Sequence, residues 1–224
     1  VGKDYISAPT CATCHISATP NQEVTHDVGE RISWTLRPPI SEKIDAKDIK
    51  EGKDTIPCEK RRGNMQDVCF QCHSKQYVQS FYKQYDDLVN LYNEKFGKPT
   101  TALMKKLKSG GLITADIEFD DEIEWTYYYL WHHEGRRARM GASMMGPDFT
   151  QWHGMFEVAD RFYVKFVPQV KELIAHGKAH GKAAAANEVE AMLNDTLNSD
   201  LHKWSTGKMS PEEKVARQKA AEEF

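Results

Sequence analysis

The sequence contains two copies of the pattern Cys-x-x-Cys-His, at residues 11–15 and 69–73. Two thiols separated by two residues and followed at once by an imidazole are what covalent attachment of haem c requires. The cysteines form thioethers with the porphyrin vinyl groups, and the histidine binds the iron from one side. The pattern therefore predicts two haem c groups attached through these four cysteines, with the two histidines as proximal iron ligands: Cys11, Cys14 and His15, and Cys69, Cys72 and His73.

Three other uses of a Cys-x-x-Cys pair fit the sequence less well. A thioredoxin-like redox site places the pair in a βαβ unit, and no alternation of strand and helix patterns is visible. A zinc site could use both pairs, but it would leave the histidine after each pair unexplained. A structural disulfide accounts for neither repeat. The fifth cysteine, Cys58, has no spare partner, so we expect a free thiol there.

Charge and hydropathy exclude several classes of partner. The chain has 30 Lys and Arg against 33 Asp and Glu, so it has no basic surplus with which to neutralise a nucleic acid. No run of about 18 apolar residues is present, so we expect no membrane span. The sequence starts at Val1, and we expect a processed chain or part of a longer one. Because haem c is attached outside energy-transducing membranes, we expect a periplasmic or equivalent extracytoplasmic location, after removal of an export signal.

The distribution of apolar residues predicts a mainly α protein with three parts. Residues 1–74 are rich in proline and poor in long apolar periodicities, so we expect a loop-rich segment whose two haems supply much of its core. Residues 75–204 form the expected helical region, which supplies distal iron ligands and subunit contacts. Residues 205–224 are a charged C-terminal tail. The predicted fold class is a multihaem cytochrome c in which a loop-rich haem-binding segment precedes long C-terminal helices.

Apolar residues recurring at three- and four-residue steps predict the individual helices. Their expected limits are residue 74 to Gly97–Pro99, 100–108, 116–145, a helix capped by Asp148 and kinked at Pro168, 183–197, and a tail helix capped by Ser210 with Pro211 at its first position. The segment Trp125–His133 is aromatic on every face of its helix, so we expect other helices or haem rings to bury it. Residues 176–181 are expected to be weakly structured.

The remaining histidines are candidates for the sixth coordination position of an iron. A sixth histidine or methionine closes the iron for electron transfer, whereas an open position allows chemistry on a small ligand. We favour His26, His133 and His153 as distal ligands. His132 points about 100° away from His133 on a helix, so it can face a second haem, a carboxylate or water.

The other candidates are weaker. Methionines 140, 144 and 145 are alternative ligands, although such a cluster more often fills a core. We expect His176, His180 and His202 to be solvated surface residues. Two irons need at most two distal ligands and three are favoured, so the surplus suggests that the chain also contacts haems attached elsewhere.

Three segments resemble the C-terminal part of the hydroxylamine oxidoreductase family of octahaem cytochromes c. They are Thr25–Arg31 (THDVGER), Leu130–Arg139 (LWHHEGRRAR) and Met144–Gly154 (MMGPDFTQWHG). The resemblance implies that this chain is a C-terminal portion, or one piece of a split chain, with the last two of eight haem sites. It also implies long C-terminal helices, assembly as trimers or larger, and a catalytic haem attached upstream of this sequence.

The resemblance bears on the direction of the reaction through Phe149. In oxidative members, a tyrosine of one subunit is covalently joined to the catalytic haem of a neighbour, and we place that position at Phe149. A phenyl ring has no phenolic oxygen and cannot form this link. The resemblance therefore favours a reductive, nitrite-reducing oxidoreductase of inorganic nitrogen compounds, with Phe149 at the catalytic pocket and a small redox protein as electron partner. The alternative is a multihaem electron-transfer subunit without catalysis.

Overall fold

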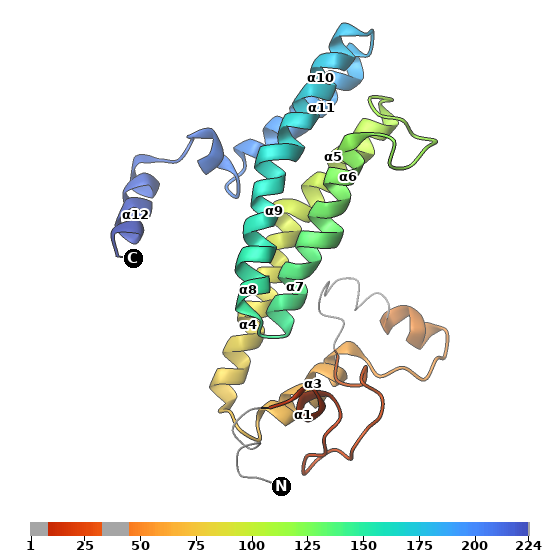
Figure 1. Ribbon diagram of the computed structural model, residues 1–224, viewed down its shortest axis with the longest axis vertical. Helices are drawn as coiled ribbons and strands as arrows, with labels where there is room; N and C mark the ends of the chain where they lie inside the picture. The colour runs from red at the N-terminus through yellow and green to blue at the C-terminus, as the bar shows by residue number, and fades with distance from the viewer. Residues whose placement is uncertain (1–8, 33–44, 224) are drawn as a thin grey trace. The chain divides into compact units, whose positions relative to one another are not determined.

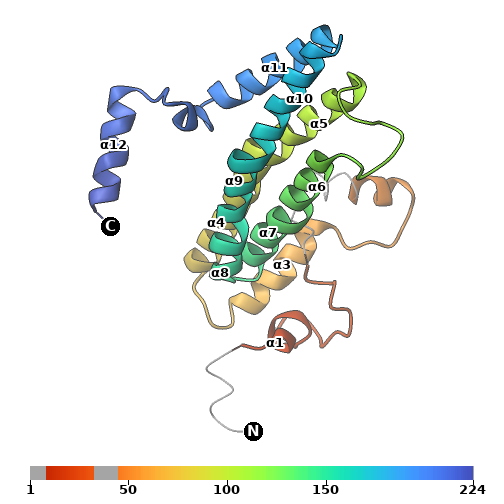
Figure 2. The same ribbon diagram turned by 45° about the horizontal axis from the view of Figure 1, so that its top comes forward.

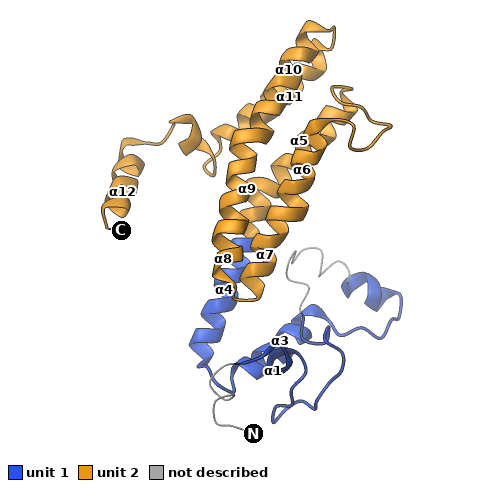
Figure 3. Cartoon of the chain, viewed as in Figure 1, with its two compact units in different colours: residues 1–89 blue, residues 90–224 orange. Residues whose placement is uncertain are grey.

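The computed structural model of the chain describes residues 9–32 and 45–223. Helices dominate these ranges, which contain no strand and a single isolated β-bridge, between Thr19 and Gln22. The prediction of a mainly α protein is therefore confirmed. The chain forms two compact units, residues 1–89 (unit 1) and 90–224 (unit 2), shown in Figure 3. The predicted parts 1–74, 75–204 and 205–224 stay a prediction, and residues 1–8 and 33–44 of the first part lie outside the described residues.

Unit 1 contains both Cys-x-x-Cys-His motifs and three labelled helices. The first motif forms one of these helices, and the second motif lies between the other two. The helices are α1 (Cys11–His15), α3 (Cys58–Cys69) and most of α4 (Lys75–Tyr92), and residues 45–50 are also helical (Figure 1). Thr10 caps α1, because its hydroxyl accepts a hydrogen bond from the Thr13 N–H. Helices α1 and α3 contact each other.

Helix α3 lies in the segment that we expected to be loop-rich. Only Cys58, Asn64 and Val68 of its 12 residues are buried, so it has no continuous apolar stripe. A helix of this kind has no signal at the 3.6-residue period, which explains why the sequence pattern did not predict it. Acidic Glu59 lies in its first turn, where a negative charge interacts favourably with the helix dipole.

The predicted helix end at Gly97–Pro99 is wrong. Helix α4 continues through the π-helical turn η2 (Asn93–Gly97) into α5 (Lys98–Ser109). Pro99 has no N–H to donate to the carbonyl of Lys95, four residues earlier. His202 Nε2 donates to this carbonyl instead, at 2.7 Å, so a side chain from far along the sequence satisfies the group that proline leaves open.

The next continuous helix consists of α6 (Glu122–Tyr128), η3 (Tyr129–Glu134) and α7 (Gly135–Ser143). The predicted start at residue 116 is wrong, because the chain forms a loop in which Phe119 has a φ of 66°. Within unit 2 the aromatic segment is only partly covered, so its burial by other helices or haem rings stays a prediction. Leu130 is buried, but Trp125 is 46% exposed.

Another long helical stretch, residues 147–179, changes between α and π geometry four times. Its parts are α8 (Pro147–Thr150), η4 (Gln151–Phe156), α9 (Glu157–Asp160), η5 (Arg161–Phe166) and α10 (Val167–Ala179). Gly146, not Asp148, is at the N-cap position, so the predicted cap is wrong, and Pro147 is the first helical residue. Pro168 is the second residue of α10, which follows the π-helical turn η5. Residues 176–179 are helical, contrary to the expectation of weak structure.

Figure 2 shows the helices of unit 2, and a hydrophobic core of buried side chains joins them. Helix α11 (Ala183–Asn198), close to its predicted limits, packs against α10 and α5. The core residues are almost completely buried. Large side chains among them include Phe96, Phe162, Phe166, Leu103, Leu107, Leu130 and Leu193. The tail forms the 3₁₀ turn η6 (Lys203–Thr206) and α12 (Pro211–Glu222), whose predicted Ser210 cap is confirmed. Among the described helices, none is long and apolar enough to cross a membrane.

Candidate haem sites and the histidine cleft

A hydrogen-bond network in unit 1 ties the loop after the first Cys-x-x-Cys-His motif to the helix that carries the second. The carboxylate of Asp67, on α3, accepts from Asn21 Nδ2 at 2.7 Å, from Gln22 Nε2 at 2.9 Å and from the Thr19 hydroxyl. The bonds from Thr19, Gln22 and Asn21 hold the pKa of Asp67 below its ordinary value. Because Asp67 precedes Cys69 by two residues, the network fixes the two motifs relative to each other.

Arg31 connects the end of α1 to a more distant part of unit 1. Its guanidinium is buried, with 1% of the residue exposed, and donates to the carbonyls of Cys14, at 3.1 Å, and Ser17. Carbonyl groups at the end of a helix have no partner within the helix and need donors of this kind. Arg31 thus stabilises the turn from which His15 projects.

The four motif thiols are free and lie close together. Burial and then the neighbouring thiol of Cys11 raise the pKa of Cys14, and burial followed by Cys14 and Cys72 raises that of Cys69. None of the four motif cysteines is in a disulfide, so all four are available for thioether bonds to haem. Cys58 is buried and free, as expected, and burial together with a hydrogen bond to Asp45 raises its pKa to about 11.

The histidines and their surroundings fit attached haem groups. His15 is half-buried, and its Nδ1 is a buried atom without a hydrogen-bond partner. His73 is exposed and stacks on Tyr77, with ring centroids 4.4 Å apart. Phe70 and Tyr77 are 40% and 50% exposed beside the second motif. Free thiols, an imidazole after each pair and uncovered aromatic rings are the donors and the apolar surface that a covalent haem requires.

A cleft of about 450 Å³ in unit 2 brings together two of the segments that resemble the octahaem cytochromes. We call it the histidine cleft. It is lined by His132, His133, Arg136, Arg137, Met140, Gly141, Met144, Gly146 and Phe149. Helix α7 and the α8–η4 segment approach closely beside it, because a Cβ at Gly154 would lie 2.6 Å from the Cα of Ala138.

The histidines that we predicted as distal ligands differ in their neighbours and in their exposure to solvent. His132 stacks on Tyr128 at 4.6 Å, and His133 Nε2 lies 3.0 Å from Arg137 Nη2. The His153 ring lies 5.8 Å from that of Phe149 and is not among the residues that line the cleft. His26 is exposed in unit 1. That His26, His133 and His153 are distal iron ligands stays a prediction.

Two of the three histidines that we expected at the surface are exposed, His176 and His180. The prediction for His202 is wrong, since it is 1% exposed. Its Nδ1 lies 2.7 Å from the Tyr163 hydroxyl, and burial lowers its pKa. No local pattern distinguishes it from the other two, because its partners come from distant parts of the sequence.

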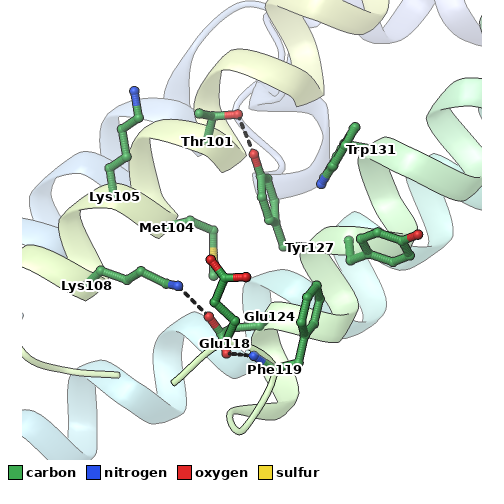
Figure 4. A pocket seen from close by; sticks show the side chains of 10 residues that line it. Thr101, Met104, Lys105, Lys108, Glu118, Phe119, Glu124, Tyr127 and Trp131 are labelled. Atoms are coloured by element: carbon green, nitrogen blue, oxygen red, sulfur yellow. Dashed lines mark hydrogen bonds and ion pairs between the residues drawn. The ribbon is translucent and has the colours of Figure 1, made fainter. Parts of the chain in front are cut away.

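A second cleft, of about 310 Å³, lies between α5 and α6–η3 (Figure 4). Its walls include Tyr127 and Trp131, and the Tyr127 hydroxyl lies 2.9 Å from that of Thr101. At its other end Lys108 forms an ion pair with Glu124 at 2.6 Å. Although burial opposes ionisation of Glu124, the bond from Lys108 and a backbone N–H hold its pKa below the ordinary value. No sequence pattern predicted this cleft, although the aromatic run 125–133 was a signal for it.

Comparison with known proteins identifies the family from the N-terminal half of the chain. No curated protein and no solved structure matches the chain. The family model described as "Seven times multi-haem cytochrome CxxCH" matches residues 1–118 of the 224 residues, which is more than half of the chain. The chain therefore belongs to this family of multi-haem cytochromes, and it carries covalently bound haem c and transfers electrons through it.

Proposed function

We propose that this chain is the C-terminal part of a multihaem oxidoreductase of inorganic nitrogen compounds, similar to hydroxylamine oxidoreductase and of the reductive, nitrite-reducing type. The observation that carries the proposal is the histidine cleft. In it, His132 and His133 from one segment of the resemblance meet Met144 and Phe149 from another. Chain segments that are separated in sequence but line one cleft support a shared function.

Unit 1 would supply the electron relay. Cys11, Cys14, Cys69 and Cys72 would hold two haem groups, with His15 and His73 as proximal ligands. The haem groups supply one-electron transfer when bound. The protein's part is to tie the loop after the first motif to the helix of the second motif through Asp67, and to fix the turn after Cys14 through Arg31.

The histidine cleft supports a contact with a haem attached elsewhere. Met144 and Phe149 are 61% and 54% exposed, and apolar side chains that gather on a surface mark an interaction site. Arg136 lines the same cleft, and a guanidinium group pairs well with carboxylates such as those of a haem. Phe149 offers a ring without a hydroxyl, so it would pack against such a group without a covalent link.

The same proposal includes the assembly and its location. A haem that contacts the cleft would come from the rest of a longer chain or from a second subunit, in a trimer or larger assembly. A small redox protein would exchange electrons with the relay. The location would be periplasmic or an equivalent extracytoplasmic compartment, which is typical of c-type cytochromes.

Carbon monoxide binding to the reduced native assembly tests the proposal. An enzyme of this type must have one haem with an open coordination position, so we expect a spectral change in part of the haem population. If no haem binds carbon monoxide or nitric oxide, the proposal fails and the chain is an electron-transfer cytochrome without catalysis. The intact mass of the native polypeptide tests the second part, since 224 residues with only two haems would contradict membership of a longer multihaem chain.

A further inference from the structure

Four side chains of unit 2 form a continuous series of hydrogen bonds between two of the proposed iron ligands. Arg137 Nη2 lies 3.0 Å from His133 Nε2, and Arg137 Nη1 donates to Glu157 Oε2 at 3.1 Å. The other oxygen of this carboxylate, Oε1, lies 3.1 Å from His153 Nδ1. One guanidinium and one carboxylate therefore connect His133 with His153.

The donors and acceptors in this series fix the state of each ring. A carboxylate accepts hydrogen bonds, so the Nδ1 of His153 carries the proton that Glu157 binds. This leaves the Nε2 of His153 available to a metal, and the nearest carboxylate oxygen, from Asp148, is 3.6 Å away. Arginine only donates, so His133 accepts through Nε2. Of the two histidines, His153 is therefore the one already oriented with Nε2 free.

We propose that Glu157 is a positioning residue for His153 as an iron ligand, and that Arg137 moderates the charge that Glu157 exerts on it. The inference rests on the proposed ligand role of His153. A carboxylate bonded to the outer nitrogen of a ligating histidine fixes the ring and increases its basicity. A more basic ligand stabilises the ferric iron and lowers the reduction potential, whereas the adjacent guanidinium weakens this effect.

Haem midpoint potentials of the native assembly test the proposal in two variants. Glu157→Gln keeps a hydrogen-bond acceptor but removes the negative charge, so we expect one haem potential to rise. Arg137→Gln leaves Glu157 unneutralised, so we expect the same potential to fall. Asp160→Asn is the matched control, because it removes an exposed carboxylate from the same helix α9 as Glu157. Shifts no larger than in the control, or of the same sign in both variants, would overturn the proposal.

A third variant separates this inference from the assignment on which it rests. His153→Ala should remove one low-spin electron paramagnetic resonance signal of the oxidised protein. If the signal persists, His153 is not a ligand and both statements fail, while the carbon monoxide test of the nitrogen-compound reaction is unaffected. If the signal is lost but the two charge variants leave the potentials unchanged, only the role of Glu157 and Arg137 is refuted.

Discussion

The buried His202 gives the most direct test of how unit 2 is stabilised. Its Nε2 donates to the Lys95 carbonyl at 2.7 Å, and its Nδ1 lies 2.7 Å from the Tyr163 hydroxyl, which donates to it. His202→Phe keeps a ring of similar size between Phe96 and Phe162, whose centroids are 5.9 and 5.0 Å away. The substitution therefore removes the hydrogen bonds and retains most of the packing.

The expected cost follows from the groups that lose their partners. A buried polar group without a hydrogen bond costs about 1–3 kcal/mol. The Lys95 carbonyl loses its His202 donor, while half-buried Tyr163 can turn its hydroxyl to water. We therefore expect His202→Phe to lower the free energy of unfolding by about 1–3 kcal/mol. Urea unfolding followed by circular dichroism measures this as a lower midpoint at unchanged slope.

The pH dependence gives an independent check. Burial lowers the pKa of His202 below its ordinary value of 6.5, so below pH 6.5 the unfolded chain takes up a proton more readily than the folded one. The wild type must lose stability as the pH falls from 6.5 towards the lowered pKa, and the variant lacks this loss. The stability difference should therefore be largest above pH 6.5 and shrink in acid. A difference that is independent of pH, or no greater than that of the exposed His180→Phe, would refute the reasoning.

Four further predictions concern other parts of the chain. Arg31→Met removes the donors to the Cys14 and Ser17 carbonyls, so we expect the free energy of unfolding to fall by about 1–3 kcal/mol. We also expect a lower haem content at the first motif, measured by peptide mass. Gly154→Ala places a Cβ in steric overlap with the Phe149 carbonyl oxygen and should lower the free energy of unfolding by about 1–3 kcal/mol, whereas Gly63→Ala, with nothing within 4 Å of the new Cβ, should stabilise α3 in thermal unfolding. The lowered pKa of Asp67 contributes stability that is present above about pH 3.8 and lost as the pH falls through its folded pKa, so Asp67→Asn should flatten the acid unfolding curve. Ser210→Ala removes the cap of α12 and should cost about 1 kcal/mol, seen as faster amide exchange in its first turn.

Local spacing predicted the parts of the fold that depend on near neighbours. The limits of α11 and the cap of α12 were predicted correctly, because periodicity and capping act within one or two turns. The predicted helix end at Pro99 was wrong for the same reason. A proline ends a helix when the carbonyl four residues before it finds no other hydrogen-bond donor. Here His202, 107 residues away in the sequence, donates to that carbonyl.

The sequence also predicted only part of the candidate site. The histidine cleft contains His132, His133 and Phe149, all of which the sequence had selected. The sequence did not indicate that Arg137 and Glu157 connect His133 with His153, because a charged residue on a helix is most often solvated. It also did not indicate the cleft beside Tyr127, which depends on the packing of α5 against α6.

The sequence by itself determined the chemistry and the class of this protein. Two Cys-x-x-Cys-His motifs identify haem c because attachment needs only five consecutive residues, and the 3.6-residue period identifies helices for the same local reason. The tertiary structure decided which polar groups are buried and which aromatic groups are not. His202 is enclosed while Trp125 is exposed, because burial depends on contacts between residues that are far apart in sequence.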